Sequence, residues 1–269
     1  MNEKSAPHPL RGQAFYRLGG QTDDGGEALE SLPSTAGPWT PQAQHGGPPA
    51  ALLGRAVEAL GGGVVGRFTM ELHGPVPVAR LVARASVVRP GRSVSLVAAE
   101  LLDPEADRLV ASARAWLFPA VEDGPVRPSP PAHGPEDGEV RPRPAAWHGG
   151  YLDAVEWRWV KGSVEEQGPG LVWMRPPPLV EGEPLSPLQR LLACVDSASG
   201  VSAALDVRRW RFLNTELTVH VLREPVGEWI CLDAATTLGP GSVGVATSTA
   251  YDERGPVARS AQALLVQRR

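Results

Sequence analysis

Segments in which every second residue is apolar recur in both halves of the chain. Residues 67–73 read RFTMELH and residues 217–221 read LTVHV. Because successive side chains of a strand point to opposite faces, this period of two predicts strands with one buried face. Turn sequences follow at 89–91 (RPG), 239–241 (GPG) and 252–255 (DERG), so we expect the strands to run antiparallel.

A longer period predicts one helix in each half. Residues 52–61 read LLGRAVEALG and residues 191–200 read LLACVDSASG, and the apolar residues of 188–195 recur at helical spacing. Gly47 and Ser186 are the expected N-caps, since each precedes a Pro at the first helical position, where a missing N–H costs nothing.

The two halves carry the same landmarks in the same order. These are 52–61 with 191–200, 70–73 with 217–220, 90–91 with 240–241, and 110–111 with 257–258. An ordered set of matches indicates an internal duplication. Each copy is predicted to be a helix followed by several strands, which is an α+β arrangement with the helix wrapped by an antiparallel sheet.

A segment rich in Pro, Gly and charge separates the copies. It spans 119–146, has no apolar periodicity and is expected to be an exposed linker. We therefore expect an N-terminal domain over 1–120, a Pro-rich linker over 121–146 and a C-terminal domain over 147–269. The length of 269 residues suits one large core or two modest ones.

Composition excludes several classes of protein. The chain has 26 Lys and Arg against 30 Asp and Glu, which argues against a nucleic-acid partner bound through bulk charge. Its two cysteines, Cys194 and Cys231, cannot build a disulfide framework or a zinc cluster, and no metal is expected. There is neither a secretory h-region near Met1 nor an apolar run long enough for a bilayer, so we expect a cytoplasmic protein without a membrane partner.

Several segments together resemble the acyl-CoA thioesterase II-like family. They are QHGGPPAALLGRAVE (44–58), RPGRSV (89–94), DSASG (196–200), NTELTVHVLREPVGEW (214–229) and AQALLVQRR (261–269). The resemblance implies a double hotdog, in which two tandem helix-wrapped antiparallel sheets are joined by the linker. It also implies hydrolysis of a fatty acyl thioester without a cofactor, a role in fatty acid metabolism, and assembly into a homo-oligomer.

The resemblance further implies a water-holding site in the second copy. In that family an Asp on the helix, a Thr or similar residue on the next strand and a Gln on the last strand hold a water. These positions fall on Asp196, Asn214 and Gln262. Asn214 departs from the Thr pattern, although its amide can both donate and accept hydrogen bonds.

The duplication points to the same residues without the family. In the alignment of the two copies, which needs small gaps beyond the helix, Asp196 faces Val57 and Gln262 faces Ala115. Asp196 lies beside the apolar stripe of its helix, where an unpaired carboxylate would be expensive, so we expect amide donors from neighbouring strands. A polar cluster in one copy of a duplicated fold indicates chemistry in that copy.

The predicted mechanism is hydrolysis with Asp196 as the general base on a water that Asn214 and Gln262 also bind. Backbone N–H groups at a helix N-terminus would meet the oxyanion, and Gly46 and Gly47 are the candidates. His45 could donate to the substrate, or it could only set the entry of the chain into the helix.

Each of these residues also has a purely structural interpretation. Asp196 could be a solvated surface carboxylate, Gln262 a polar residue on an exposed strand, and Asn214 a turn residue. The tryptophans of the second half either line an acyl tunnel or pack in the core: Trp157, Trp159, Trp173, Trp210 and Trp229. Three arginines either meet coenzyme A phosphates or are solvated charges: Arg89, Arg92 and Arg223.

Two other functions stay open. A double-hotdog hydratase or dehydratase would use His45 and Asp196 across the two halves, but it usually has Gly four residues after the His and Gln or His four after the Asp. Here those positions hold Pro49 and Gly200. A non-catalytic acyl-chain binder is the second, since a fold does not guarantee an activity. The acyl group, and whether coenzyme A or a carrier protein bears it, are left undetermined.

Overall fold

The computed structural model describes residues 10–23, 25–121, 128–144 and 147–269. The first half contains β1 (Tyr16–Gln21), β2 (Glu27–Ser31), η1 (Pro33–Thr35), α1 (Gly47–Ala59), β3 (Val64–Leu72), β4 (Arg80–Arg89), β5 (Ser95–Asp103) and β6 (Arg108–Phe118). The remainder contains η2 (Pro135–Asp137), α2 (Tyr151–Ala154), β7 (Glu156–Lys161), β8 (Gly170–Arg175), α3 (Pro187–Val195), α4 (Ala198–Val201), β9 (Trp210–Asn214), β10 (Glu216–Val221), β11 (Ile230–Leu238), β12 (Val243–Asp252) and β13 (Gly255–Arg268).

The strand order repeats in the two halves, as the duplication predicts. The first half is ordered β1-β2-β4-β5-β6-β3, and the second half, read from its outer edge, is ordered β7-β8-β11-β12-β13-β10. The prediction that each copy begins with its helix is incomplete, because two strands precede α1 and two precede α3. β1 escaped notice because its residues after Tyr16 are all exposed and show no alternation.

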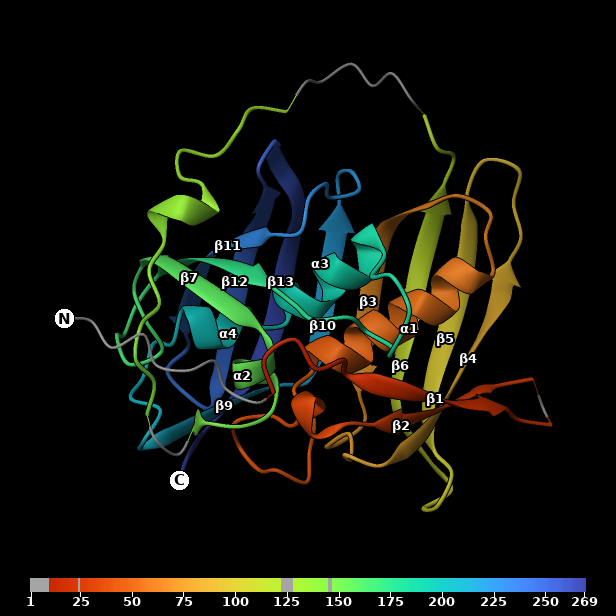
Figure 1. Ribbon diagram of the computed structural model, residues 1–269, viewed down its shortest axis with the longest axis horizontal. Coiled ribbons are helices and arrows are strands. Elements are labelled where there is room, and N and C mark those ends of the chain that lie inside the picture. Colours follow the sequence, from red (N-terminus) through yellow and green to blue (C-terminus); the bar gives the residue numbers. More distant parts are fainter. Residues whose placement is uncertain (1–9, 24, 122–127, 145–146) are drawn as a thin grey trace.

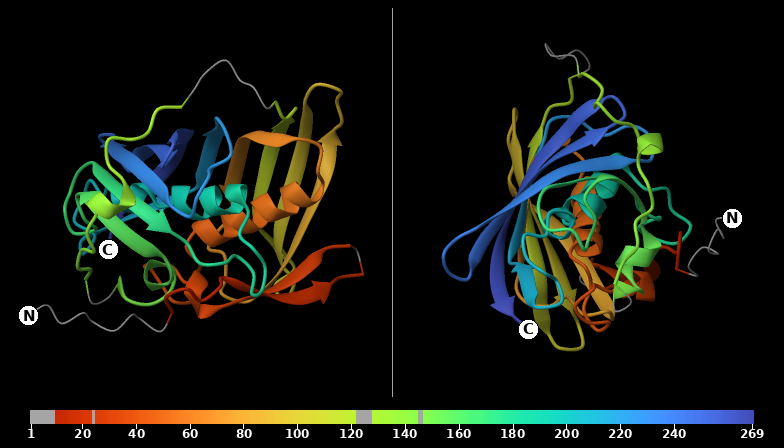
Figure 2. Two further views of the ribbon diagram at one scale, coloured as in Figure 1. Left: turned by 45° about the horizontal axis from the view of Figure 1, so that its top comes forward. Right: turned by 90° about the vertical axis from the view of Figure 1, so that its left-hand side faces the viewer.

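Both halves join into one continuous antiparallel sheet. β3 pairs with β10, so that Met70 lies opposite Leu217 and Phe68 opposite Val219. The predicted turns are present, with β12 and β13 meeting at Asp252 and Gly255. The sheet curves around α1 and α3, which lie against one of its faces (Figures 1 and 2).

The two helices pack side by side in opposite directions. The start of α1 meets the end of α3, since a Cβ at Gly47 would lie 2.3 Å from the Ala193 carbonyl oxygen. At the other end Glu58 of α1 accepts hydrogen bonds from the Ser186 hydroxyl (2.7 Å) and the Gln189 amide (2.8 Å). Because of this antiparallel packing, the N-terminus of α1 faces the C-terminus of α3.

The predicted caps are right for α3 and one residue late for α1. Ser186 is the N-cap of α3 and accepts from the Gln189 backbone N–H (3.1 Å). α1 instead begins at Gly47 with Gly46 as its N-cap, and Pro48 is the second helical residue. Pro at the second position is tolerated because that N–H would also lack a partner within the helix.

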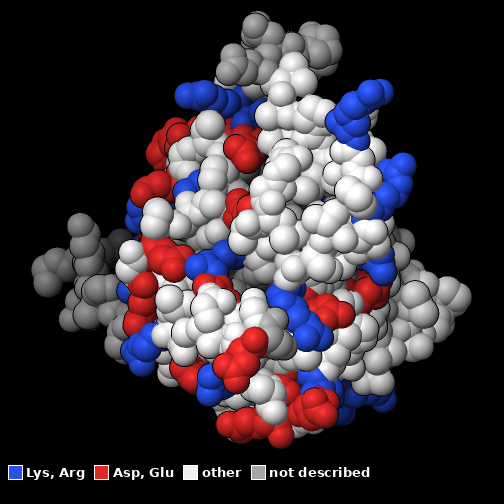
Figure 3. Space-filling model, turned by 90° about the vertical axis from the view of Figure 1, so that its right-hand side faces the viewer, with Lys and Arg blue, Asp and Glu red and all other residues white. Residues whose placement is uncertain are grey.

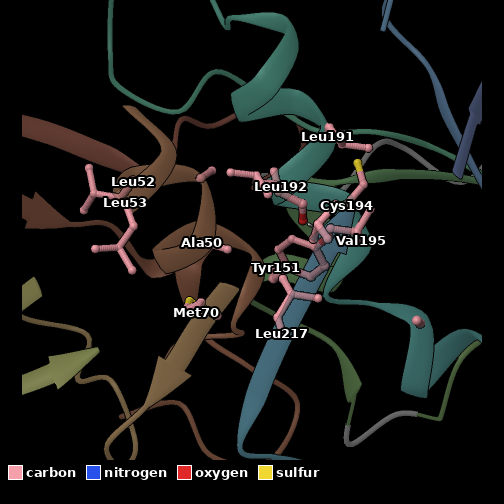
Figure 4. Close-up of a cluster of buried hydrophobic side chains, with 14 of the residues drawn as sticks. Ala50, Leu52, Leu53, Met70, Tyr151, Leu191, Leu192, Cys194, Val195 and Leu217 are labelled. Carbon is pink, nitrogen blue, oxygen red and sulfur yellow. Dashed lines mark hydrogen bonds between the residues drawn. The ribbon is translucent and has the colours of Figure 1, made fainter. Parts of the chain in front are cut away.

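The core between the helices and the sheet is apolar and continuous across both halves. Leu192 of α3 points toward α1, where a Cβ at Gly54 would lie 2.5 Å from its Cδ1, and Tyr151 lies beside Leu217 (Figure 4). Cys194 is fully buried here, and burial raises the pKa of its thiol well above the ordinary value. A thiol held in the protonated form packs as a small apolar group and is no nucleophile.

Part of the expected linker packs against the second half. Glu139 forms a β-bridge with Trp159, and a Cβ at Gly138 would lie 2.7 Å from the Arg158 carbonyl oxygen. Residues 122–127 and 145–146 of that linker lie outside the described residues. On the face beside β4 and β5, acidic and basic side chains are interspersed (Figure 3).

Candidate active site

Asp196 lies at the junction of the two halves. It caps the C-terminus of α3, and its side chain is 3% exposed. The N-terminus of α1 faces it so closely that a Cβ at Gly46 would lie 2.6 Å from Asp196 Oδ2. Only glycine leaves room for this approach, and the partial positive charge at the start of a helix is favourable to a carboxylate.

Two amides from strands of the second half hold the Asp196 carboxylate. Asn214 Nδ2 on β9 donates to Oδ1 over 2.7 Å, and Gln262 Nε2 on β13 donates to the same oxygen over 3.0 Å. The amide donors expected for this buried carboxylate are therefore present, and they come from the predicted strands. At the positions aligned with Asp196 and Gln262, the first half has Val57 and Ala115, both buried in the core.

The two amides differ in what they can still bind. Gln262 is fully buried, its Nε2 also donates to the Asp196 carbonyl oxygen (3.0 Å), and its Oε1 accepts from the Ser199 N–H (3.3 Å). Asn214 is half-buried and lines the cavity together with Asp196. Gln262 thus lies behind the carboxylate, whereas Asn214 stays accessible from the cavity.

His45 sits between the start of α1 and Asp196. Its Nδ1 accepts from the Gly47 N–H (3.0 Å) and lies 3.2 Å from Asp196 Oδ2. Burial lowers the pKa of His45, while the Asp196 charge acts in the opposite direction more weakly. The imidazole is therefore neutral near pH 7, and its contact with Gly47 supports the expectation that it sets the entry into α1.

Sequence reasoning missed Tyr151, which supports this arrangement from α2. Its ring stacks on His45 with centroids 3.8 Å apart and planes 5° apart. Its hydroxyl donates to the Ala193 carbonyl oxygen (2.6 Å) and lies 3.0 Å from Ser197 Oγ. No signal in the sequence distinguished this tyrosine, because the contact joins segments from three parts of the chain.

A cavity of about 490 Å³ opens beside Asp196. Five large aromatic side chains contribute to its wall: Trp39, Trp147, Trp157, Trp159 and Phe212. The Trp39 ring meets the Trp147 and Phe212 rings edge-on, with centroids 5.5 Å apart in both pairs. Both halves contribute to this wall, so the cavity exists only in the assembled fold.

The other tryptophans and arginines considered from the sequence have different surroundings. Trp157 and Trp159 line the cavity, whereas Trp173 is buried in the core and donates to the His133 carbonyl oxygen (3.2 Å). Arg223 pairs with the buried Asp252 through both guanidinium nitrogens, which is a structural role. Among the described residues, no group of three or more His, Cys, Asp or Glu could hold a metal ion.

Comparison with known proteins gives two family matches. The model described as the acyl-CoA thioesterase N-terminal domain matches residues 35–118, and the model described as the C-terminal domain matches residues 135–266. Together they span most of the chain. No curated protein matches it.

Solved structures share the whole fold at low sequence identity. A candidate thioesterase II from Thermobifida fusca YX is 19% identical, with 98% of this chain and 100% of that chain covered and a TM-score of 0.75. A hot dog fold protein of unknown function from Alicyclobacillus acidocaldarius is 17% identical, with 97% and 99% covered and a TM-score of 0.73. An acyl-CoA thioesterase II from Mycobacterium marinum is 14% identical, with 94% and 95% covered and a TM-score of 0.63. These likenesses support the double hotdog fold.

Proposed function

The chain belongs to the acyl-CoA thioesterase family of thioester hydrolases, and from this premise we propose that Asp196 activates the water that attacks the thioester. The observation that carries the proposal is the convergence of two amides on one buried carboxylate at the wall of an apolar cavity. Burying a carboxylate is costly unless it is well paired, so a carboxylate kept at a cavity wall indicates chemistry.

In this proposal Asp196 is the general base. Asn214 and Gln262 both donate hydrogen bonds to Asp196 Oδ1, so Oδ2 is the oxygen left to take a proton from water. Gln262 is a positioning residue, because its amide groups are already used within the protein. Asn214 is the amide that can also bind the water, through its side-chain oxygen.

The start of α1 supplies the proposed oxyanion donor. Pro48 and Pro49 have no N–H, and the Gly47 N–H is given to His45. The Gly46 N–H has no acceptor among the described residues, so it is the backbone donor free to meet a developing negative charge. The Nε2–H of neutral His45 is a second possible donor from the same cavity wall.

The substrate proposed is a fatty acyl thioester. The aromatic wall formed by Trp39, Trp147 and their neighbours suits an apolar acyl group, since burial of apolar surface drives its binding. A thiolate leaves readily from the tetrahedral intermediate, so water attack needs no covalent enzyme intermediate.

Replacement of Asp196 by Asn tests the proposal. Asn keeps the oxygen that Asn214 and Gln262 bind but cannot accept a proton from water, so thiol release should fall about 10²- to 10⁴-fold. The matched control is Asp233→Asn on the exposed side of β11, which should leave the rate unchanged. Thiol release and melting temperature are measured for both variants over acyl-CoAs of several lengths.

Three outcomes would contradict the proposal. If Asp196→Asn released thiol as fast as the wild type, Asp196 would not be the general base. An enoyl absorbance change with a 3-hydroxyacyl substrate, without thiol release, would favour a hydratase using His45 and Asp196. Binding without any turnover by the wild type would favour an acyl-chain binder.

The expected compartment and assembly stay predictions. No helix within the described part of the chain is long and apolar enough to cross a membrane. A role in fatty acid metabolism and a homo-oligomer are proposed from the resemblance to the family, and a cytoplasmic location from the sequence pattern alone.

A further inference from the structure

Four arginines gather where β9 begins and β13 ends, beside the candidate active site. Arg209 and Arg211 lie on either side of Trp210, the first residue of β9, while Arg268 ends β13 and Arg269 follows it. The strands pair there, with Arg268 opposite Trp210, and the Arg269 N–H donates to the Arg209 carbonyl oxygen (3.0 Å). The end of the chain lies beside β9 in Figure 1.

No Asp or Glu side chain among the described residues pairs with these guanidinium groups. All four residues are exposed. Arg208, their neighbour, is by contrast paired with Glu165. Like charges held close together cost free energy. Because the chain has a net charge of −4, a cluster of arginines without side-chain ion pairs is expected to have a function.

Two of the arginines are held in place by aromatic rings. The Arg269 guanidinium lies 5.2 Å from the centroid of the Trp39 ring, and that of Arg268 lies 5.5 Å from the centroid of the Trp210 ring. A cation over a ring is attracted to it but keeps its charge available to an anion. These contacts pre-order the side chains without neutralising them.

The cluster borders the cavity that Asp196 faces. Arg211 lines this cavity, and so does Trp39, over which Arg269 lies. Arg211 is three residues from Asn214 along β9, which is about 10 Å of extended strand. A partly extended pantetheine arm can span that distance between a thioester beside Asp196 and a phosphate at the rim.

We infer that these arginines form a phosphate-binding subsite for the nucleotide part of coenzyme A. Arg211 and Arg269 stand at the rim, with Arg209 and Arg268 beside them, and planar guanidinium groups suit the oxygen pairs of phosphate. The inference rests on the proposed function for the position of the thioester. It selects coenzyme A, with its diphosphate and 3′-phosphate, over a carrier protein whose phosphopantetheine has a single phosphodiester.

The test compares Arg211→Gln and Arg269→Gln with Arg254→Gln, an exposed arginine in the turn at the other end of β13. Loss of a charged hydrogen bond should raise KM for an acyl-CoA about tenfold in each rim variant and leave kcat unchanged. The same variants should hydrolyse the matching acyl-pantetheine, which has no phosphate, as the wild type does. Arg254→Gln should match the wild type on both substrates.

Binding of free coenzyme A, measured by calorimetry, tests this inference independently of the proposed function because it requires no hydrolysis. The affinity for coenzyme A should fall about tenfold in the rim variants, and dephospho-coenzyme A should bind the wild type more weakly. If all variants hydrolysed acyl-CoA with the same KM, the phosphate subsite would be wrong while the proposed function would be retained. The inference would also be overturned if the rim variants hydrolysed an acyl-carrier protein and an acyl-CoA with the same loss of activity, because the nucleotide would then make no difference. Arginine-dependent binding without hydrolysis would keep the subsite and reject the function.

Discussion

At the scale of single residues, the space at position 46 is limited by the Asp196 carboxylate itself. A Cβ on Gly46 would lie 2.6 Å from Asp196 Oδ2 and 2.7 Å from Oδ1, closer than packed atoms approach. Its φ of −69° is open to any residue, so the limit is the carboxylate and not the backbone. Substitution therefore displaces the carboxylate without straining the chain.

We expect Gly46→Ala to lower thiol release about 10²-fold, because a displaced base no longer meets the attacking water. The matched control is Gly241→Ala in the turn between β11 and β12, where a Cβ would meet nothing within 4 Å. Kinetics and melting curves of both variants are the measurement. Full activity in Gly46→Ala would show that the carboxylate position is not critical.

His45 gives the stability of the fold a dependence on pH. Burial lowers its pKa in the folded state, whereas in the unfolded chain it titrates near 6.5. The unfolded state therefore takes up a proton first as the pH falls, and the free energy of unfolding should decrease below about pH 6.5. The stabilising contribution is complete above that pH.

Melting temperatures between pH 5 and 8 check this expectation. His45→Gln, which does not titrate, should show a shallower fall than the wild type. His220→Gln, at an exposed position on β10, should keep the wild-type slope. An identical slope in His45→Gln would place the pH dependence on other groups.

At the scale of elements, the antiparallel packing of α1 on α3 positions the site. One end of the helix pair brings Gly46 to Asp196, and the other is joined by hydrogen bonds from Ser186 and Gln189 to Glu58. Ser186 both caps α3 and contacts α1, so it connects local helix stability to the contact between the halves.

Ser186→Ala should therefore lower the free energy of unfolding by about 1 to 2 kcal/mol, since it removes an N-cap and one donor to Glu58. Ser242→Ala, in an exposed turn with no side-chain hydrogen bond among the described residues, is the control and should change it little. Urea denaturation measures both. Equal stability of the two variants would mean that water replaces the cap without cost.

At the scale of the whole molecule, the halves are not separable units. β3 and β10 pair over Arg67–Glu71, and the aromatic cavity wall takes Trp39 from one half and Trp157 from the other. The core is one cluster of buried side chains that runs through both helices. Neither half buries its own sheet edge without its counterpart.

Heating should consequently give a single unfolding transition, with calorimetric and van 't Hoff enthalpies that agree. Differential scanning calorimetry of the full chain measures both enthalpies. Two resolved transitions would show that the halves unfold independently and that the shared sheet contributes little to their coupling.

The sequence by itself indicated the duplication, the α+β class and the two core helices, through the apolar period of strands and helices. The alignment of one copy with the other pointed to Asp196 and Gln262, and the resemblance to the family added Asn214. Sequence reasoning missed β1, β2, β7 and β8, of which β1 is exposed after Tyr16 and β8 (GLVWMR) has no alternation, and it placed the cap of α1 one residue late.

Tertiary structure alone decided which groups surround Asp196. His45, Gly46 and Tyr151 reach it from distant parts of the chain, because α1 runs antiparallel to α3 and α2 packs beneath both. The tertiary structure also gives the two amides different surroundings. The Gln262 amide makes all its hydrogen bonds within the protein, behind the carboxylate, whereas Asn214 faces the cavity. Periodicity fixes which face of an element is apolar, but hydrogen-bond partners depend on how elements from both halves are oriented, and no local pattern encodes that orientation.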